Sequence, residues 1–86
     1  MFKVVVLSEA KKFLAQLAQS DHSILQRISR AIDSLQEDPF RGKPLRHDFK
    51  GKYSLRAGVY RIIYQIEKQK VTVYVLDAGH RKNIYG

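Results

Sequence analysis

The sequence predicts an α+β domain with an N-terminal strand, a two-helix hairpin and then a twisted antiparallel sheet of about four strands. Apolar residues recur at helical spacing in the first half of the chain and alternate with polar residues in the second. The change falls at Asp38-Pro39, where the proline disfavours helical angles at the preceding residue. No repeat or linker interrupts the chain, so residues 1–86 are expected to form one domain.

The first half is expected to hold one strand and two helices. Met1–Leu7 is rich in valine and contains no breaker, which predicts a buried strand. Ser8 is expected to cap the first helix, and Ser20 or Asp21 the second. The apolar faces of these helices are Ala10, Phe13, Leu14 and Leu17, and then Ile24, Leu25, Ile28, Ile32 and Leu35. A connection of about three residues makes the pair a helical hairpin.

The second half is expected to form the rest of the sheet. Its strands are Lys43–Phe49 (a weak strand or an extended arm), Lys52–Arg56, Val59–Glu67 and Lys70–Asp77. Ala57-Gly58 and Lys68-Gln69 are short enough to be hairpin connections. Gly79 is expected to end the last strand, which leaves a short terminal segment after it.

The net charge of +8 lies entirely in the second half of the chain. Residues 1–38 carry five basic and five acidic side chains, whereas residues 39–86 carry eleven basic and three acidic ones. A basic sheet of this kind favours a polyanion as partner, because each phosphate that it neutralises releases condensed counterions. Charge alone leaves open a soluble basic protein with no such partner.

Alternation in the central hairpin predicts a phosphate-binding face. If the turn at Ala57-Gly58 pairs Arg56 with Val59, Ser54 lies opposite Arg61. One face then carries Lys52, Ser54, Arg56 and Arg61, and the other carries Tyr53, Leu55, Tyr60 and Ile62 as core. Cations gathered without a carboxylate nearby in sequence suit an anion that bridges them. The alternative is a solvated strand face.

The terminal segment adds His80, Arg81, Lys82 and Tyr85 to the basic half. Tyr85 either packs as a plug or stacks on a nucleobase. No metal site is expected, because the chain has no cysteine and His22, His47 and His80 lack ligand spacing. No cofactor is expected either, since Gly51 and Gly58 stand alone and form no glycine-rich phosphate loop.

The lack of a metal site limits the reaction that a nuclease of this sequence could use. A nuclease without metal would use attack of an RNA 2′-hydroxyl on its own phosphate, which needs a base, an acid and charge stabilisation. The apolar run Val4–Leu7 is too short for a signal-peptide core or a membrane span, so a cytoplasmic protein without membrane contact is expected.

Two segments, Lys52–Gln65 (KYSLRAGVYRIIYQ) and Val71–Tyr85, resemble the core of the RelE/ParE toxin superfamily, and the resemblance covers essentially the whole chain. It implies the RelE-like fold and a RelE-type mRNA interferase of a type II toxin–antitoxin system. Such toxins are ribosome-dependent, metal-independent endoribonucleases that cut mRNA in the ribosomal A site and inhibit translation. It also implies a cognate RelB-like antitoxin, with operator DNA contacted only through that antitoxin. A basic domain of marginal stability suits a disordered acidic-apolar segment that folds on binding.

The resemblance also implies roles for individual residues. Lys52 corresponds to a basic residue of the active surface, and Arg61 to the arginine that holds the scissile phosphate. Arg81 corresponds to a transition-state stabiliser or general acid, and Tyr85 to a tyrosine that stacks on or activates the nucleotide. His80 is adjacent to a position where some relatives use a histidine for acid–base work. Further RNA contacts are expected at Arg46, Lys50, Ser54, Arg56 and Lys82.

Ser54 departs from the pattern, because RelE itself has a second lysine there that is assigned as general base. Either Lys52, Tyr85 or His80 takes over that function, or catalysis is weaker. Two other functions therefore stay open. One is a ParE-like inhibitor of DNA gyrase, which binds a protein and cuts nothing. The other is a catalytically weak module that binds RNA or a partner.

Overall fold

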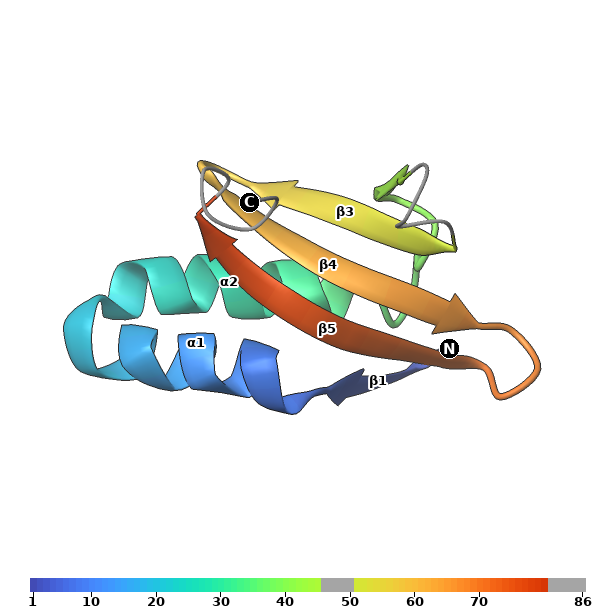
Figure 1. Ribbon diagram of the computed structural model, residues 1–86, viewed down its shortest axis with the longest axis horizontal. Helices are drawn as coiled ribbons and strands as arrows, with labels where there is room; N and C mark the ends of the chain where they lie inside the picture. Colours follow the sequence, from blue (N-terminus) through green and yellow to red (C-terminus); the bar gives the residue numbers. More distant parts are fainter. Residues whose placement is uncertain (46–50, 81–86) are drawn as a thin grey trace.

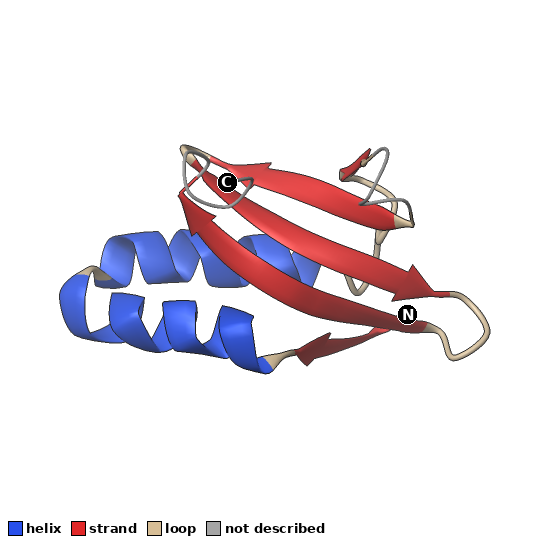
Figure 2. Cartoon of the chain, viewed as in Figure 1, coloured by secondary structure: helices blue, strands red, loops and turns tan. Residues whose placement is uncertain are grey.

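The computed structural model describes residues 1–45 and 51–80 and confirms the predicted α+β class. Figure 1 shows two helices lying against one face of a twisted sheet, and Figure 2 separates the same two layers by colour. The elements are β1 (Lys3–Val6), α1 (Ser8–Ser20), α2 (His22–Ser34), β2 (Lys43–Pro44), β3 (Lys52–Ala57), β4 (Tyr60–Glu67) and β5 (Thr72–His80). None of the helices in the described ranges has the length and apolarity that a membrane crossing requires.

The helical hairpin is tighter than the sequence predicts. Only Asp21 separates α1 from α2, where a longer connection was expected. Its backbone N–H still donates to the Leu17 carbonyl of α1, while its side chain accepts from the Ile24 N–H of α2 at 3.2 Å. Asp21 is therefore the predicted cap of the second helix. The expected cap at Ser8 is wrong by one position, because Leu7 precedes α1 and makes no side-chain bond there.

The sheet has the strand order β1-β5-β4-β3-β2 among the described residues. β1 pairs with β5 in parallel, and the remaining neighbours are antiparallel. In Figure 1 the blue β1 lies beside the red β5 at one edge, while the green β2 lies at the other. Within the expected strand Lys43–Phe49, Lys43–Pro44 forms β2, and residues 46–49 lie outside the described ranges. β5 continues past Gly79 to His80, so Gly79 does not end it.

The core lies between the helices and the sheet. The predicted helical faces are confirmed there: Ala10, Leu17, Ile28, Ile32 and Leu35 are buried, and Phe13, Leu14, Ile24 and Leu25 are packed against them. Tyr64 of β4 is the largest fully buried side chain in the described residues. Burial of a tyrosine in this layer requires a partner for its hydroxyl.

The register of the central hairpin differs from the expected one. Ala57 pairs with Tyr60 and Arg56 with Arg61, so the turn is Gly58-Val59 and not Ala57-Gly58. Gly58 has a φ of 64°, a conformation that favours glycine at the first turn position. Relative to the expected pairing, each residue of β3 is opposite a residue two positions further along β4. An even shift leaves every side chain on its expected face, so the predicted division into a core face and a basic face is confirmed.

Candidate active site

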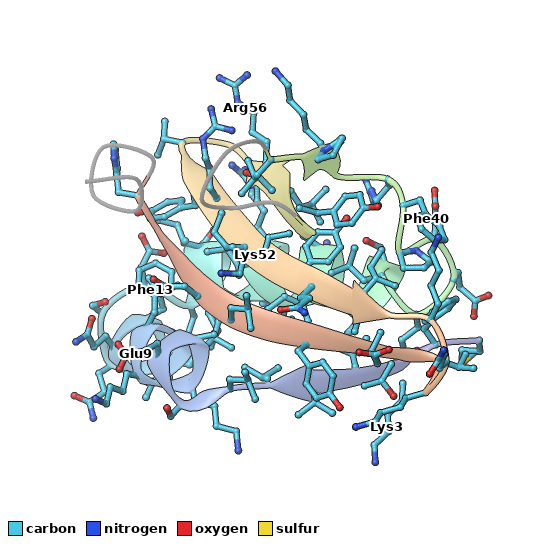
Figure 3. The ribbon with its side chains drawn as sticks, turned by 45° about the vertical axis from the view of Figure 1, so that its right-hand side comes forward. Lys3, Glu9, Phe13, Phe40, Lys52 and Arg56 are labelled. Carbon is cyan, nitrogen blue, oxygen red and sulfur yellow. The ribbon has the colours of Figure 1, made fainter. Side chains whose placement is uncertain are left out.

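The basic face of the β3–β4 hairpin is the side of the sheet opposite the helices. Lys52, Ser54 and Arg56 alternate along β3 on this face, and Arg61 joins them from β4. Figure 3 shows Arg56 extending beyond the end of the sheet and Lys52 nearer its middle. Arg56 is exposed, whereas Lys52 and Arg61 are half-buried. The structure thus brings four of the predicted site residues onto one surface.

A pocket of about 350 Å³ lies on this face. Within the described ranges 1–45 and 51–80, the residues that line it are Arg41, Gly42, Lys43, Ser54, Leu55, Arg56 and Arg61. Four of these seven residues are basic and none is acidic, so the pocket presents a positive potential that attracts an anion. Guanidinium groups also match the geometry of phosphate oxygens.

Arg61 lies directly opposite Arg56 in the ladder. Like charges at directly opposed positions destabilise an antiparallel pair. Asp77 of β5 is on the same face, opposite Ile63, but its carboxylate accepts from the Ala78 N–H at 2.8 Å and does not line the pocket. The sequence analysis found no carboxylate near these basic residues in the chain. The sheet nevertheless brings Asp77 of β5 onto the face that carries Arg61.

Ser54 is 4% exposed, and its Oγ has no hydrogen-bond partner among the described residues. A buried hydroxyl without a partner has lost its hydrogen bonds to water and has formed none in the protein. This lowers the free energy of unfolding by about 1–3 kcal/mol. Most buried polar groups in native proteins have a partner, so a group without one calls for an explanation, and a bound ion is one such explanation. Ser54 also lines the pocket, so an anion that reached its Oγ there would supply the missing acceptor.

The second wall of the pocket, residues 41–43, comes from the end of the connection between α2 and β2 and from the first residue of β2. The Tyr64 hydroxyl donates to the Pro39 carbonyl at 2.7 Å and accepts from the Gly42 N–H at 2.9 Å, which holds this connection against β4. Arg41 Nη1 donates to Ser34 Oγ at 2.7 Å. Burial raises the pKa of Tyr64, and the hydrogen bond from Gly42 partly opposes that shift.

Arg41 and Lys43 are pocket residues that the sequence analysis missed. β2 spans only Lys43–Pro44, and two residues are too few for alternation to assign a face. The one available signal was their basic character directly after Pro39, within the most basic part of the chain.

His80 lies elsewhere. It pairs with Tyr60 in the β4–β5 ladder, and their rings meet edge to face at 5.8 Å between centroids. Tyr60 in turn contacts Phe13 of α1, so this pair is on the helix side of the sheet, opposite to Arg61. The structure therefore does not bring His80 into the pocket.

The other predicted site residues, Arg46, Lys50, Arg81, Lys82 and Tyr85, lie outside the described residues. Within the ranges that are described, no three His, Cys, Asp or Glu side chains are grouped closely enough to hold a metal ion.

Three comparisons place the chain among known proteins. The family profile of the ParE toxin of type II toxin–antitoxin systems, parDE, matches residues 4–85. Toxin RelG of Mycobacterium tuberculosis is 35% identical over 80 residues, which cover 86% of this chain and 92% of RelG. A chain in the crystal structure of the toxin–antitoxin complex RelBE2 from the same organism superposes with a TM-score of 0.82 at 33% identity, covering 93% of this chain and 98% of that one.

A YoeB/ParE toxin from Agrobacterium tumefaciens shares the fold, with a TM-score of 0.82 over 92% of this chain and 98% of that chain at 20% identity. The family match extends over nearly the whole sequence, including the helical hairpin and all the strands of the sheet that carries the basic pocket. The chain therefore belongs to the ParE toxin family of type II toxin–antitoxin systems, within the RelE/ParE toxin superfamily.

Proposed function

We propose that the chain is a ribosome-dependent, metal-independent endoribonuclease that cuts mRNA in the ribosomal A site and thereby inhibits translation. The observation that carries the proposal is the pocket in which Arg56 and Arg61 face each other beside the unpaired hydroxyl of Ser54. A phosphodiester carries a negative charge that two neighbouring guanidinium groups can bind together.

The reaction is attack of a 2′-hydroxyl on the adjacent phosphorus, with departure of the 5′-oxygen of the next nucleotide. Arg61 binds the scissile phosphate and stabilises the charge that builds on its oxygens. Lys52, on the same face of β3, or Tyr85 takes the proton from the 2′-hydroxyl. His80 is the weaker candidate for that base, because its ring packs on Tyr60 on the other side of the sheet. Arg81 is assigned as the acid or as a further charge stabiliser.

The partner that controls this activity is a RelB-like antitoxin. The similar RelBE2 chain was crystallised in a toxin–antitoxin complex, which supports a protein partner of that kind here. An acidic segment that covers the pocket would neutralise its positive charge and exclude mRNA. A small acidic protein that co-purifies with the chain from its native operon and suppresses cleavage is expected. Operator DNA is then contacted only through this antitoxin.

A second candidate is inhibition of DNA gyrase, because the matching family profile is that of ParE. Gyrase poisoning requires a protein-binding surface and no phosphate chemistry. A module that binds RNA or a partner and cleaves weakly is the third candidate, and Ser54 is the reason to keep it. Neither alternative depends on Arg61 in the way that cleavage does.

The test is a cell-free translation reaction in which mRNA 5′ ends are mapped by primer extension. The wild type is compared with Arg61→Ala and with Lys11→Ala, a control that removes one positive charge from an exposed position of α1. Cuts are expected only with translating ribosomes, at the wild-type rate in Lys11→Ala and reduced about 10²-fold or more in Arg61→Ala. Intact mRNA together with inhibited gyrase supercoiling would replace the proposal with its ParE-like alternative.

A further inference from the structure

We propose that Lys43 and Ser54 form a second phosphate-binding subsite, which takes the phosphate next to the one that Arg61 binds. The inference rests on the proposed function, because it assigns a further contact with the same nucleic acid strand. It concerns the segment 41–43, in which Arg41 and Gly42 end the α2–β2 connection and Lys43 begins β2.

The pairing of β2 with β3 places Lys43 and Ser54 side by side. Lys43 lies directly opposite Ser54, so both side chains leave the sheet on the same face. Both also line the pocket. The Cβ atoms of directly opposed residues are about 4.5–5.5 Å apart, close enough for an ammonium and a hydroxyl to bind one phosphate group together.

The two side chains have groups that a phosphate can bind. Ser54 Oγ is buried without a partner, and Lys43 forms no ion pair with a carboxylate of the described residues. A lysine supplies charge and a serine supplies one directed O–H donor. Phosphate oxygens accept both, and bonds to an ionised acceptor are about twice as strong as neutral ones.

Backbone hydrogen bonds hold the residues on either side of Lys43 in place. On one side, the Gly42 N–H is bound to the Tyr64 hydroxyl. On the other side, the Leu45 N–H donates to the Lys52 carbonyl at 2.9 Å. The backbone around Lys43 is thus fixed before any ligand arrives, and a prepositioned group loses less entropy when it binds.

The distance from Arg61 distinguishes this subsite from the first. Arg61 is opposite Arg56, which places it diagonally from Ser54, and diagonal neighbours are about 7–8 Å apart. The two positions therefore suit consecutive phosphates of a single strand, with Arg56 adjacent to both.

The experiment is a titration of the full chain with pyrophosphate, followed by the backbone amide signals in a nitrogen–proton NMR spectrum. In the wild type, the signals of Gly42, Lys43 and Ser54 are expected to shift saturably. Lys43→Gln is expected to weaken pyrophosphate binding about tenfold, the loss of one charge-assisted contact. Lys43→Arg retains the charge and is expected to restore most of the affinity. Lys11→Gln, with the same loss of charge on α1, is expected to bind as the wild type does.

Ser54→Ala separates the subsite from a general effect of charge, because it removes only the hydroxyl. It is expected to weaken binding several-fold while the protein stays folded, since the buried group that it deletes has no partner to lose. Wild-type signals at Gly42 and Lys43 that do not respond to pyrophosphate would overturn the inference. Equal affinity in the wild type and Lys43→Gln would overturn it as well.

The cell-free cleavage assay, run on the same variants, distinguishes the two proposals. Binding of pyrophosphate that depends on Lys43, with mRNA left intact, would refute the nuclease and retain the subsite. Cleavage that depends on Arg61, with Lys43→Gln unchanged in both pyrophosphate affinity and cleavage, would refute the subsite and retain the nuclease.

Discussion

Arg56 and Arg61 occupy directly opposed positions in the β3–β4 ladder, on the side of the sheet that faces away from the helices. Opposed like charges weaken a hairpin, and a bound anion turns the same arrangement into a favourable one. Removal of one of the two charges is therefore expected to change both the stability of the hairpin and its response to an anion.

Replacing one of these arginines should show how the repulsion between them and a bound anion affect stability. Arg56→Gln is expected to raise the free energy of unfolding at low salt by about 0.2–1 kcal/mol, because the repulsion is removed. Pyrophosphate should then stabilise the variant less than it stabilises the wild type. Thermal unfolding followed by circular dichroism, with and without pyrophosphate, measures both effects. An Arg56→Gln protein that is less stable at low salt would contradict the expectation.

Tyr64 holds the connection that bears Arg41 and leads into Lys43 of β2, through hydrogen bonds to Pro39 and Gly42. Tyr64→Phe leaves a carbonyl and an N–H without this partner and is expected to lower the free energy of unfolding by about 1–3 kcal/mol. Urea denaturation measures the loss. Tyr53→Phe is the control, since the Tyr53 ring stacks on Tyr64 at 5.4 Å between centroids but its hydroxyl is not part of this bond pair. Similar losses in the two variants would show that the bond pair contributes little.

The same hydroxyl predicts how stability depends on pH. Burial raises the pKa of Tyr64 in the folded protein above its ordinary value of 10.0. Above pH 10 the unfolded chain therefore loses a proton that the folded chain retains, and the stability contributed by Tyr64 falls as the pH rises towards the folded pKa. The difference in unfolding free energy between wild type and Tyr64→Phe should be constant below that range and shrink above it. A difference that grows with alkaline pH would show that the folded-state pKa is lowered instead.

A substitution at Gly42 tests how closely the α2–β2 connection approaches the sheet. A Cβ at Gly42 would clash with the Tyr64 hydroxyl and lie 3.0 Å from the Ser54 carbonyl oxygen. Gly42→Ala is expected to cost about 1–3 kcal/mol, as overpacking does, and to weaken pyrophosphate binding by displacing Lys43. Gly79→Ala is the matched control, because a Cβ there meets nothing within 4 Å. Chemical denaturation of both variants gives the comparison, and equal stabilities would contradict the predicted crowding.

The faces of the central hairpin could be predicted from sequence because alternation is a local property, whereas its exact pairing could not. The turn depends on whether Gly58 is the second or the first residue of the loop, and both choices place Arg61 on the basic face. Lys43 could not be assigned to the site, since its face is set by pairing with Ser54 and not by its neighbours in the chain. The parallel pairing of β1 with β5 is likewise a tertiary choice that neither strand specifies alone.

The position of β5 has a consequence for synthesis of the protein. β5 lies between β1 and β4, so it joins the first strand of the chain to the rest of the sheet, yet it is translated after all its sheet neighbours. A nascent chain that has exposed the helices and β1 still lacks the strand that β1 must pair with. The sheet therefore cannot close until Thr72–His80 have emerged from the ribosome, and pairing between such distant segments is slow. The described residues that line the basic pocket are all translated before β5, but β4, which carries Arg61, gains its second sheet neighbour only when β5 has emerged.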